Sequence, residues 1–475
     1  MMGLKSRMIR AVGFLLMVEG LACTVTEVDI RCKGISRQVG CTECSTEGHC
    51  LPGRVPVDPW LSFATKTQRE LQIDDQWNRL QMLDAHNAYN ARAYGYGYGV
   101  NDTCNWPPPY ENNWCVALAN QVLSFTDLLN MGIRSLEIDN WWCEDGAMRM
   151  AHLSDEAAIG CLPYHRLYAD GIKEIADWLN SPGNEQEMVR IYLNEKFSQG
   201  HDEEVNRPLE QYLGKRMLTP AELKEDYGGV WPTVRQMRQA GKNVVMASGS
   251  TAGSGELYTH GGFFIHHIYW EDIKVNQFSN YPSCGTKNAT NMIRYYSDGT
   301  HYGPIYDGVT STGVILDFTE FIKCRIQYPA TDFITPSLIQ TALFTWAKGE
   351  PSGTLTSESC VWVSKTDWRW YLSDDCSIEL HYACQNLDEP DDWTISASPG
   401  PSDPIRAECP PGYKFSIPQD GYRNQKLRES SSGLSLWINY QPWLPEPAGS
   451  TAPYVVSSVY LLLVTVTGTI FSIII

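Results

Sequence analysis

The sequence predicts an α/β fold: a TIM-like (β/α) barrel followed by a smaller, disulfide-bearing, β-rich module. From residue 60 to about residue 348, apolar strand-like runs alternate with amphipathic helical segments. Repeated strand–helix units over so long a stretch favour a barrel over a sandwich. After residue 348 the helical periodicity fades and Trp, Cys, Ser and Pro become frequent. The 15 cysteines of the chain indicate an oxidising compartment in which disulfides form.

The expected elements alternate along the barrel region. Helices are predicted at 121–131, 171–180, 230–240 and 336–347, and strands at 80–83, 133–139, 147–153, 188–197, 243–248 and 312–318. The first two helices carry apolar residues at the helical period, and Gly132 and Ser181-Pro-Gly183 end them. The pattern therefore predicts successive strands that place their carboxyl ends at one mouth of a barrel.

The two ends of the chain predict secretion and attachment to a membrane. Basic residues precede a short apolar run near the N-terminus, as in a signal peptide. The uncharged, apolar C-terminal stretch follows small residues and a short spacer, which is typical of a glycosylphosphatidylinositol (GPI) attachment signal. A retained transmembrane tail is the alternative. The expected divisions are a signal peptide (1–22), a Cys-rich segment (23–59), the barrel (60–348), a Cys/Trp-rich β module (349–445) and the GPI signal or anchor (446–475).

Charge and short motifs narrow the partners. The net charge of −18 disfavours nucleic acid. Cys41-Thr-Glu-Cys44 has a spacing seen in metal sites, but no second pair follows, so disulfides are expected. The sequons at Asn101 and Asn288 are consistent with a glycoprotein.

Polar residues close the first four predicted strands. His86 and Asn87 follow the first apolar run, and Glu137 and Asp139 lie two apart on the second strand, so they share a face. His152 ends the third strand. Glu195 lies near the carboxyl end of the fourth strand. Because barrel active sites lie at that end, we expect these side chains to meet in one pocket.

The residue types indicate a chemistry. Asn87, Glu137, Asp139 and Glu195 offer only oxygen ligands, which suit calcium or magnesium better than zinc. Three carboxylates held close together would raise each other's pKa unless a cation lay among them. Two histidines beside such a site offer a general base and a general acid near neutral pH.

Four stretches resemble the phosphatidylinositol-specific phospholipase C family, in its order and approximate spacing. They are Leu83-Asp-Ala-His-Asn-Ala-Tyr89, Gly132-Ile-Arg-Ser-Leu-Glu-Ile-Asp139, Met150-Ala-His152 and Val189-Arg-Ile-Tyr-Leu-Asn-Glu195. The likeness is to the X-domain-like phosphodiesterases in a secreted or surface-anchored form. It covers residues 80–200 well and the second half of the barrel loosely.

The resemblance implies roles for individual residues. In the metal-dependent branch, the positions matching Asn87, Glu137, Asp139 and Glu195 bind calcium, and those matching His86 and His152 perform acid–base catalysis. The metal-independent branch has an arginine at the position of Asp139, so the aspartate here favours a metal. Asp317 resembles the aspartate that orients the first histidine in the bacterial enzymes.

The implied activity is cleavage of phosphatidylinositol, or of its glycosylated form, at a membrane surface, giving diacylglycerol and inositol cyclic phosphate. A glycerophosphodiester phosphodiesterase is an alternative, although its first motif is His-Arg-Gly where this chain has His86-Asn87-Ala88. A non-catalytic adhesion protein is a further alternative, because the module at 349–445 is weakly similar to C-type lectin-like domains.

Overall fold

The computed structural model describes residues 29–97, 119–154, 157–159, 161, 163–194, 200–248, 264–266, 270–285, 292–298, 314–405 and 407–440. The predicted signal peptide, the C-terminal tail and the two sequons lie outside these residues. Among the helices that are described, none is both long enough and apolar enough to cross a bilayer.

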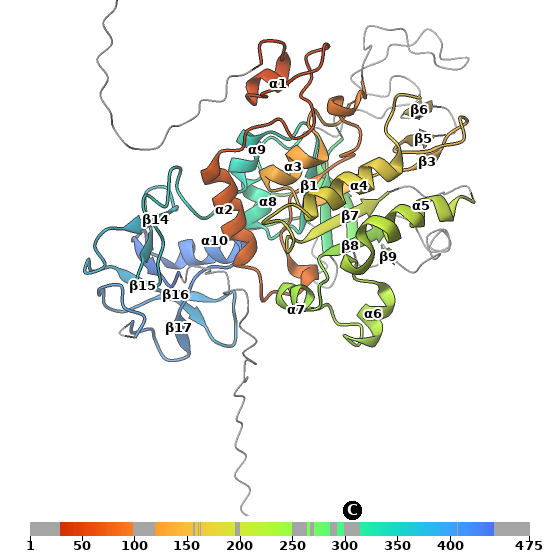
Figure 1. Ribbon diagram of the computed structural model, residues 1–475. Helices are drawn as coiled ribbons and strands as arrows, with labels where there is room; N and C mark the ends of the chain where they lie inside the picture. Colours follow the sequence, from red (N-terminus) through yellow and green to blue (C-terminus); the bar gives the residue numbers. More distant parts are fainter. Residues whose placement is uncertain are drawn as a thin grey trace, which may run out of the picture.

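Eight parallel strands form the central sheet (Figure 1). They are β1 (Asp84–Ala85), β2 (Ser135–Ile138), β7 (Val189–Leu193), β8 (Val244–Ser248), β9 (Phe264–His266), β10 (Trp270–Lys274), β11 (Met292–Tyr296) and β12 (Tyr328–Thr331). Their order in space is β10-β11-β12-β1-β2-β7-β8-β9, which follows the chain around the sheet with β12 returning to β1. The predicted (β/α) barrel architecture is therefore confirmed.

Most of the helices from residue 59 to residue 341 begin at a side-chain cap or carry an apolar stripe. The helices of this range are α2 (Pro59–Glu70), α3 (Phe125–Met131), α4 (Tyr168–Leu179), α5 (Asp202–Pro208), α6 (Pro220–Glu225), α7 (Val234–Gln239), α8 (Thr319–Lys323) and α9 (Pro336–Thr341). Ser124 caps α3 by accepting a hydrogen bond from the Asp127 amide, and Gly132 ends the helix with φ 110°. The chain then enters β2, whose four residues are all buried, as expected for an inner strand.

Three predicted strands are wrong. The segment 80–83 forms no strand, because β1 comprises only Asp84–Ala85. The segment 147–153 is not part of the barrel sheet, because it belongs to two hairpins between β2 and β7. These are β3 (Trp141–Trp142) with β4 (Met148–Arg149), and β5 (His152–Ser154) with β6 (Ala157–Ile159). The described part of 312–318 forms no strand, and Leu316 there is 81% exposed. The last barrel strand is β12, which is only four residues long and contains Pro329.

The C-terminal module is β-rich, as predicted, but it also contains a helix. Its strands are β13 (Cys360–Val363), β14 (Trp370–Ser373), β15 (His381–Asn386), β16 (Trp393–Ile395), β17 (Tyr413–Phe415) and β18 (Leu436–Ile438). The sheet order is β14-β13-β18-β15-β16, with β17 pairing β15. Helix α10 (Gly421–Ser430) was not expected, because its sequence, GYRNQKLRES, carries no apolar stripe.

Disulfides join neighbouring segments throughout the described chain. They link Cys32–Cys44, Cys41–Cys50, Cys143–Cys161, Cys284–Cys324, Cys360–Cys376 and Cys384–Cys409. The expectation that Cys41 and Cys44 form disulfides is confirmed, although each bonds to a cysteine other than the one in its own C-x-x-C motif.

Candidate functional site

A buried histidine–carboxylate pair lies at the carboxyl end of the sheet. Ala85 in β1 lies beside Thr331 in β12, so the residues that follow them, His86 and Asp332, emerge together. The His86 Nδ1 atom is 2.8 Å from Asp332 Oδ1, and Asn120 Nδ2 donates to the other carboxylate oxygen at 3.1 Å. His86 is 5% exposed and Asp332 fully buried. This arrangement fixes the imidazole ring and leaves Nε2 on the side away from Asp332.

The predicted partner of His86 is thereby corrected. Asp317 is exposed and accepts a hydrogen bond from the Thr319 amide at 2.7 Å, at the start of α8. The prediction is wrong because the described part of 312–318 is not a strand of the barrel, so Asp317 does not lie at its mouth. Asp332, at the end of the true last strand β12, holds His86 instead.

Glu137 faces His86 from the next strand. Its Oε2 lies 3.9 Å from His86 Nε2 and accepts a hydrogen bond from the Asn87 amide at 3.3 Å. The other oxygen, Oε1, and the Asn87 side-chain oxygen are buried without a hydrogen-bond partner in the described part of the chain. Two buried oxygens without donors are costly to leave unmatched, so they favour a cation or donor between them.

The remaining predicted ligands are only partly described. Asp139 follows β2, is fully buried, and accepts a hydrogen bond from Tyr89 at 3.2 Å. Glu195 lies outside the described residues. His152 is in β5, but its side chain also lies outside them. The structure thus brings His86, Asn87 and Glu137 into contact, with Asp139 at the same end of the sheet.

Sequence reasoning missed an ionic layer inside the barrel, made of Asp84, Glu137, Asp272, Arg190 and Arg294. The guanidinium of Arg294 binds Glu137, contacts Asp84 Oδ2 at 2.7 Å and contacts Asp272 Oδ1 at 3.0 Å. Arg190 lies 3.5 Å from the same Asp84 oxygen. The signal was a single arginine inside each otherwise apolar or aromatic strand, VRIYL and MIRYY, since a buried charge requires a partner.

The carboxylates control the charge of His86. Burial disfavours the imidazolium, but Asp332 and Glu137 outweigh it and raise the pKa of His86 to about 10. Burial raises the pKa of Glu137, while Arg294 and His86 oppose that rise. At neutral pH this arrangement therefore holds His86 protonated.

Two groups of donor atoms could hold a cation here. The oxygens of Asn87 and Glu137 form a hard donor set that suits calcium or magnesium. His86, Asp298 and Asp332 also place one ligand atom each within 4.8 Å of one another. The second group uses atoms of the His86–Asp332 pair, so a cation there would compete with that hydrogen bond. The oxygen set is the better fit.

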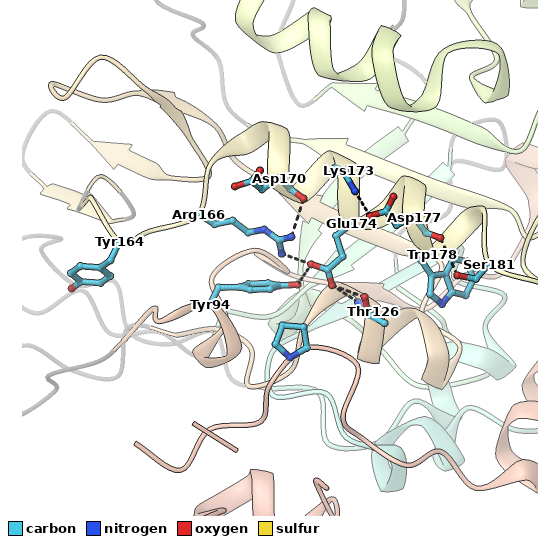
Figure 2. Close-up of a pocket in the computed structure, with 11 residues that line it drawn as sticks. Tyr94, Thr126, Tyr164, Arg166, Asp170, Lys173, Glu174, Asp177, Trp178 and Ser181 are labelled. Atoms are coloured by element: carbon cyan, nitrogen blue, oxygen red, sulfur yellow. Dashed lines mark hydrogen bonds and ion pairs between the residues drawn. The ribbon is translucent and has the colours of Figure 1, made fainter. Parts of the chain in front are cut away.

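A polar network fixes the segments around the site (Figure 2). Glu174 of α4 accepts hydrogen bonds from the Tyr94 hydroxyl at 2.8 Å and from Thr126 in α3, and it pairs with Arg166. The Arg166 guanidinium lies over the Tyr94 ring at 4.1 Å. In Figure 2 these side chains converge on Glu174 at the edge of a surface depression of about 620 Å³. We call Tyr94, Thr126, Arg166 and Glu174 the Glu174 clamp.

No protein-family model matches the chain. It is similar to an uncharacterized protein of Mycobacterium tuberculosis, found in two strains, at 22% identity over 423 residues, covering 81% of this chain and 80% of the relative. It is also similar to maintenance of telomere capping protein 6 of Lodderomyces elongisporus, at 31% identity over 86 residues, which are 17% of this chain and 14% of that protein.

Among solved structures, the chain is similar to a calcium-dependent phosphoinositol-specific phospholipase C from a Pseudomonas species. The TM-score is 0.37 at 13% identity, over 60% of this chain and 94% of that one. The phosphatidylinositol-specific phospholipase C of Listeria monocytogenes aligns with a TM-score of 0.38 at 13% identity, over 58% of this chain and 97% of that one. The order and register of the eight strands in this chain are what establish its barrel.

Proposed function

We propose that the protein is a phosphodiesterase that cleaves phosphatidylinositol-type lipids, free or glycosylated, into diacylglycerol and inositol cyclic phosphate. The observation that carries the proposal is the His86–Asp332 pair, which faces Glu137 at the carboxyl end of the barrel. A histidine held by a carboxylate through Nδ1 presents Nε2 to a substrate as a proton acceptor. The motif order around residues 80–200 also supports this substrate class.

The proposed reaction is an intramolecular phosphoryl transfer. Nε2 of His86 takes the proton of the inositol 2-hydroxyl, and that oxygen forms a bond to phosphorus. The bond between phosphorus and the glycerol oxygen breaks. The departing oxygen receives a proton, which we assign to His152. Because His86 accepts a proton only in its neutral form, its raised pKa predicts an activity that increases with pH.

A divalent cation, which we expect to be calcium, fits the site. The side-chain oxygens Asn87 Oδ1 and Glu137 Oε1 would hold it, with Asp139 and Glu195 as the further ligands. Arg294 already neutralises part of the charge of Glu137 through the other carboxylate oxygen. When bound, the cation supplies positive charge that offsets the charge developing on the phosphoryl oxygens.

The test is an assay of the full chain on phosphatidylinositol labelled in the inositol ring, with calcium or with a chelator. We expect inositol cyclic phosphate in the presence of calcium and its loss with the chelator. His86→Ala should lower the rate by about 10²–10⁴. Asp317→Asn is the matched control, because it removes an exposed carboxylate away from His86, and it should leave the rate unchanged.

Other outcomes would favour the alternatives. Release of glycerol 3-phosphate from glycerophosphodiesters would indicate that the protein is a glycerophosphodiester phosphodiesterase. If the protein hydrolysed neither substrate and the His86→Ala variant still bound glycans, the result would favour a non-catalytic adhesion protein. We further propose that the protein acts at the cell surface, since the predicted signal peptide and GPI signal would deliver it to the membrane that holds its substrate.

A further inference from the structure

A second cavity lies at the end of the barrel opposite His86. Its volume is about 350 Å³, and its lining includes Lys66, Arg69, Arg134 and Glu187. Arg134 directly precedes β2 and Glu187 lies two residues before β7, so both stand at the amino ends of strands. Arg69 is in the last turn of α2. This cavity is therefore separate from the candidate active site at the carboxyl ends.

The lining of the cavity carries an excess of positive charge. Three cations, Lys66, Arg69 and Arg134, line it with one carboxylate, Glu187. The two guanidiniums share that carboxylate, with Arg69 Nε and Arg134 Nε each 3.0 Å from the same Oε2. Burial and the neighbouring Arg69 lower the pKa of Arg134 to about 10. This local excess of positive charge in the cavity lining is unusual in a chain whose net charge is −18.

Each guanidinium retains a donor nitrogen. Arg134 uses Nε on Glu187 and Nη1 on the carbonyls of Leu129 and Ile133, both at 2.7 Å. Arg69 uses Nε and Nη2 on Glu187. Within the described chain, Arg134 Nη2 and Arg69 Nη1 donate no hydrogen bond, although the Arg134 side chain is only 4% exposed. The planar fork of arginine suits oxyanions, and buried donors strengthen that attraction.

We propose that this cavity binds a small, multivalent oxyanion of the phosphate type, held by Arg69, Arg134 and Lys66. Two guanidiniums share a single carboxylate, which leaves positive charge for an anion, and arginine forks select tetrahedral oxyanions over a spherical ion such as chloride. The inference is independent of the proposed lipid cleavage, since none of these residues belongs to the candidate active site.

The test is calorimetric titration of the full chain with inorganic phosphate, at ionic strength held constant with sodium chloride. His86→Ala with a chelator serves as the background, so that phosphate bound at the candidate active site does not contribute. We expect one saturable site on this background. Lys66→Met should weaken it by about tenfold or more, as expected for loss of one partly desolvated charge contact.

Two further variants test whether phosphate binds in this cavity and not elsewhere on the protein. Asn130 lines the cavity and accepts a hydrogen bond from Trp178 at 2.8 Å, so Asn130→Asp keeps that acceptor and adds a negative charge. It should abolish phosphate binding without loss of thermal stability. Arg216→Met is the control: Arg216 lies on the same end of the barrel, where it bonds Asn180 and Glu185, but outside the cavity lining. It should bind phosphate as the background protein does.

Three results would overturn the proposal. One is the absence of saturable phosphate binding on the His86→Ala background. Another is unchanged affinity in both folded variants, Lys66→Met and Asn130→Asp. The third is competition by chloride as strong as that by sulfate, because it would mean that the cavity attracts any counter-ion and does not select an oxyanion.

Discussion

His86 is held in its protonated form by the carboxylates around it. Asp332 lies 2.8 Å from Nδ1 and Glu137 lies 3.9 Å from Nε2, and together they outweigh the effect of burial on the pKa. A base of this kind must lose a proton before it can accept one. The pH dependence of activity and of stability therefore both report on this side chain.

Asp332→Asn should shift the activity profile to lower pH. The amide keeps the shape of the carboxyl group but removes the charge that stabilises the imidazolium, so the pKa of His86 falls. We expect the rising limb of kcat/KM to move to lower pH, with the maximum reduced by about 10² because the ring is less firmly oriented. The measurement is kcat/KM from pH 5 to pH 10. An unmoved limb would contradict the assignment of Asp332 as the partner of His86.

Stability should depend on the same titration. The folded-state pKa of His86, about 10, is above its ordinary value of 6.5, so ionisation of His86 contributes stability that is fully present below pH 6.5. This contribution is lost as the pH rises toward 10. In thermal denaturation with a chelator, the difference in Tm between the wild type and His86→Ala should narrow across this window. A constant difference would mean that His86 is neutral in the folded protein.

At the scale of elements, the Glu174 clamp ties the loop after β1 to helices α3 and α4. Tyr94 belongs to the loop that follows His86, and its hydroxyl accepts a hydrogen bond from the Phe125 amide at 2.6 Å while donating to Glu174. Arg166 follows the hairpin that carries His152, and its carbonyl accepts a hydrogen bond from the Met150 amide at 3.0 Å. The Glu174 carboxylate thus connects the segment that follows His86 with the segment that follows His152.

Glu174→Gln should loosen both segments together. The change removes the charge that pairs with Arg166, and we expect a loss of about 2 kcal/mol in the free energy of unfolding, because the bond is charge-assisted and partly buried. It should lower kcat more than it raises KM, because the segments that carry both histidines lose a shared contact. Asp177→Asn on the same helix is the control, because its pair with Lys173 is exposed. If Glu174→Gln and Asp177→Asn lowered stability and kcat equally, the Glu174 clamp would have no special role in holding these segments.

At the scale of the whole molecule, the module packs directly on the barrel, beside α2 and α8 in Figure 1. Trp346 is fully buried between them: its indole donates to Thr67 of α2 at 3.1 Å and lies 5.9 Å from the ring of Trp370. At Gly421 a side chain would collide with Ile322 of α8. Because of this close packing, we expect the barrel and the module to unfold as one unit.

Arg325→Met tests this coupling. Arg325, on the barrel, binds Asp391 of the module through two hydrogen bonds, at 2.9 and 2.6 Å, and lies 3.0 Å from Asp420. Removing it leaves Arg423 as the remaining cation beside these two carboxylates, at 3.2 and 3.5 Å, so we expect a loss of about 2 kcal/mol from the lost charge-assisted bonds. Calorimetry should still show one transition, at lower temperature.

The matched control is Arg235→Met, whose pair with Asp74 is exposed and joins two parts of the barrel. It should cost about 1 kcal/mol or less. Two separate transitions in the wild type or in Arg325→Met would show that the module folds independently of the barrel.

The sequence by itself determined the barrel class, the disulfide-rich module and the placement of His86, Asn87, Glu137 and Asp139 at one end of the sheet. Local patterns were sufficient for this, because β2 is buried on both faces and its polar residues, Glu137 and Asp139, end it at the mouth of the barrel. His86 and Asn87 follow β1 in the same way. Periodicity and strand ends are local properties, which a sequence displays directly.

The tertiary structure alone decided which side chains meet. Asp332, not Asp317, holds His86, because the parallel pairing of β1 with β12 joins residues 246 positions apart. Other long-range contacts place Arg294 on Glu137 and gather Arg69, Arg134 and Glu187 at the other end of the barrel. A short strand such as β12 carries too little pattern to be recognised in the sequence. An arginine in a buried strand indicates that it needs a partner, but the local sequence does not show which distant residue that partner is.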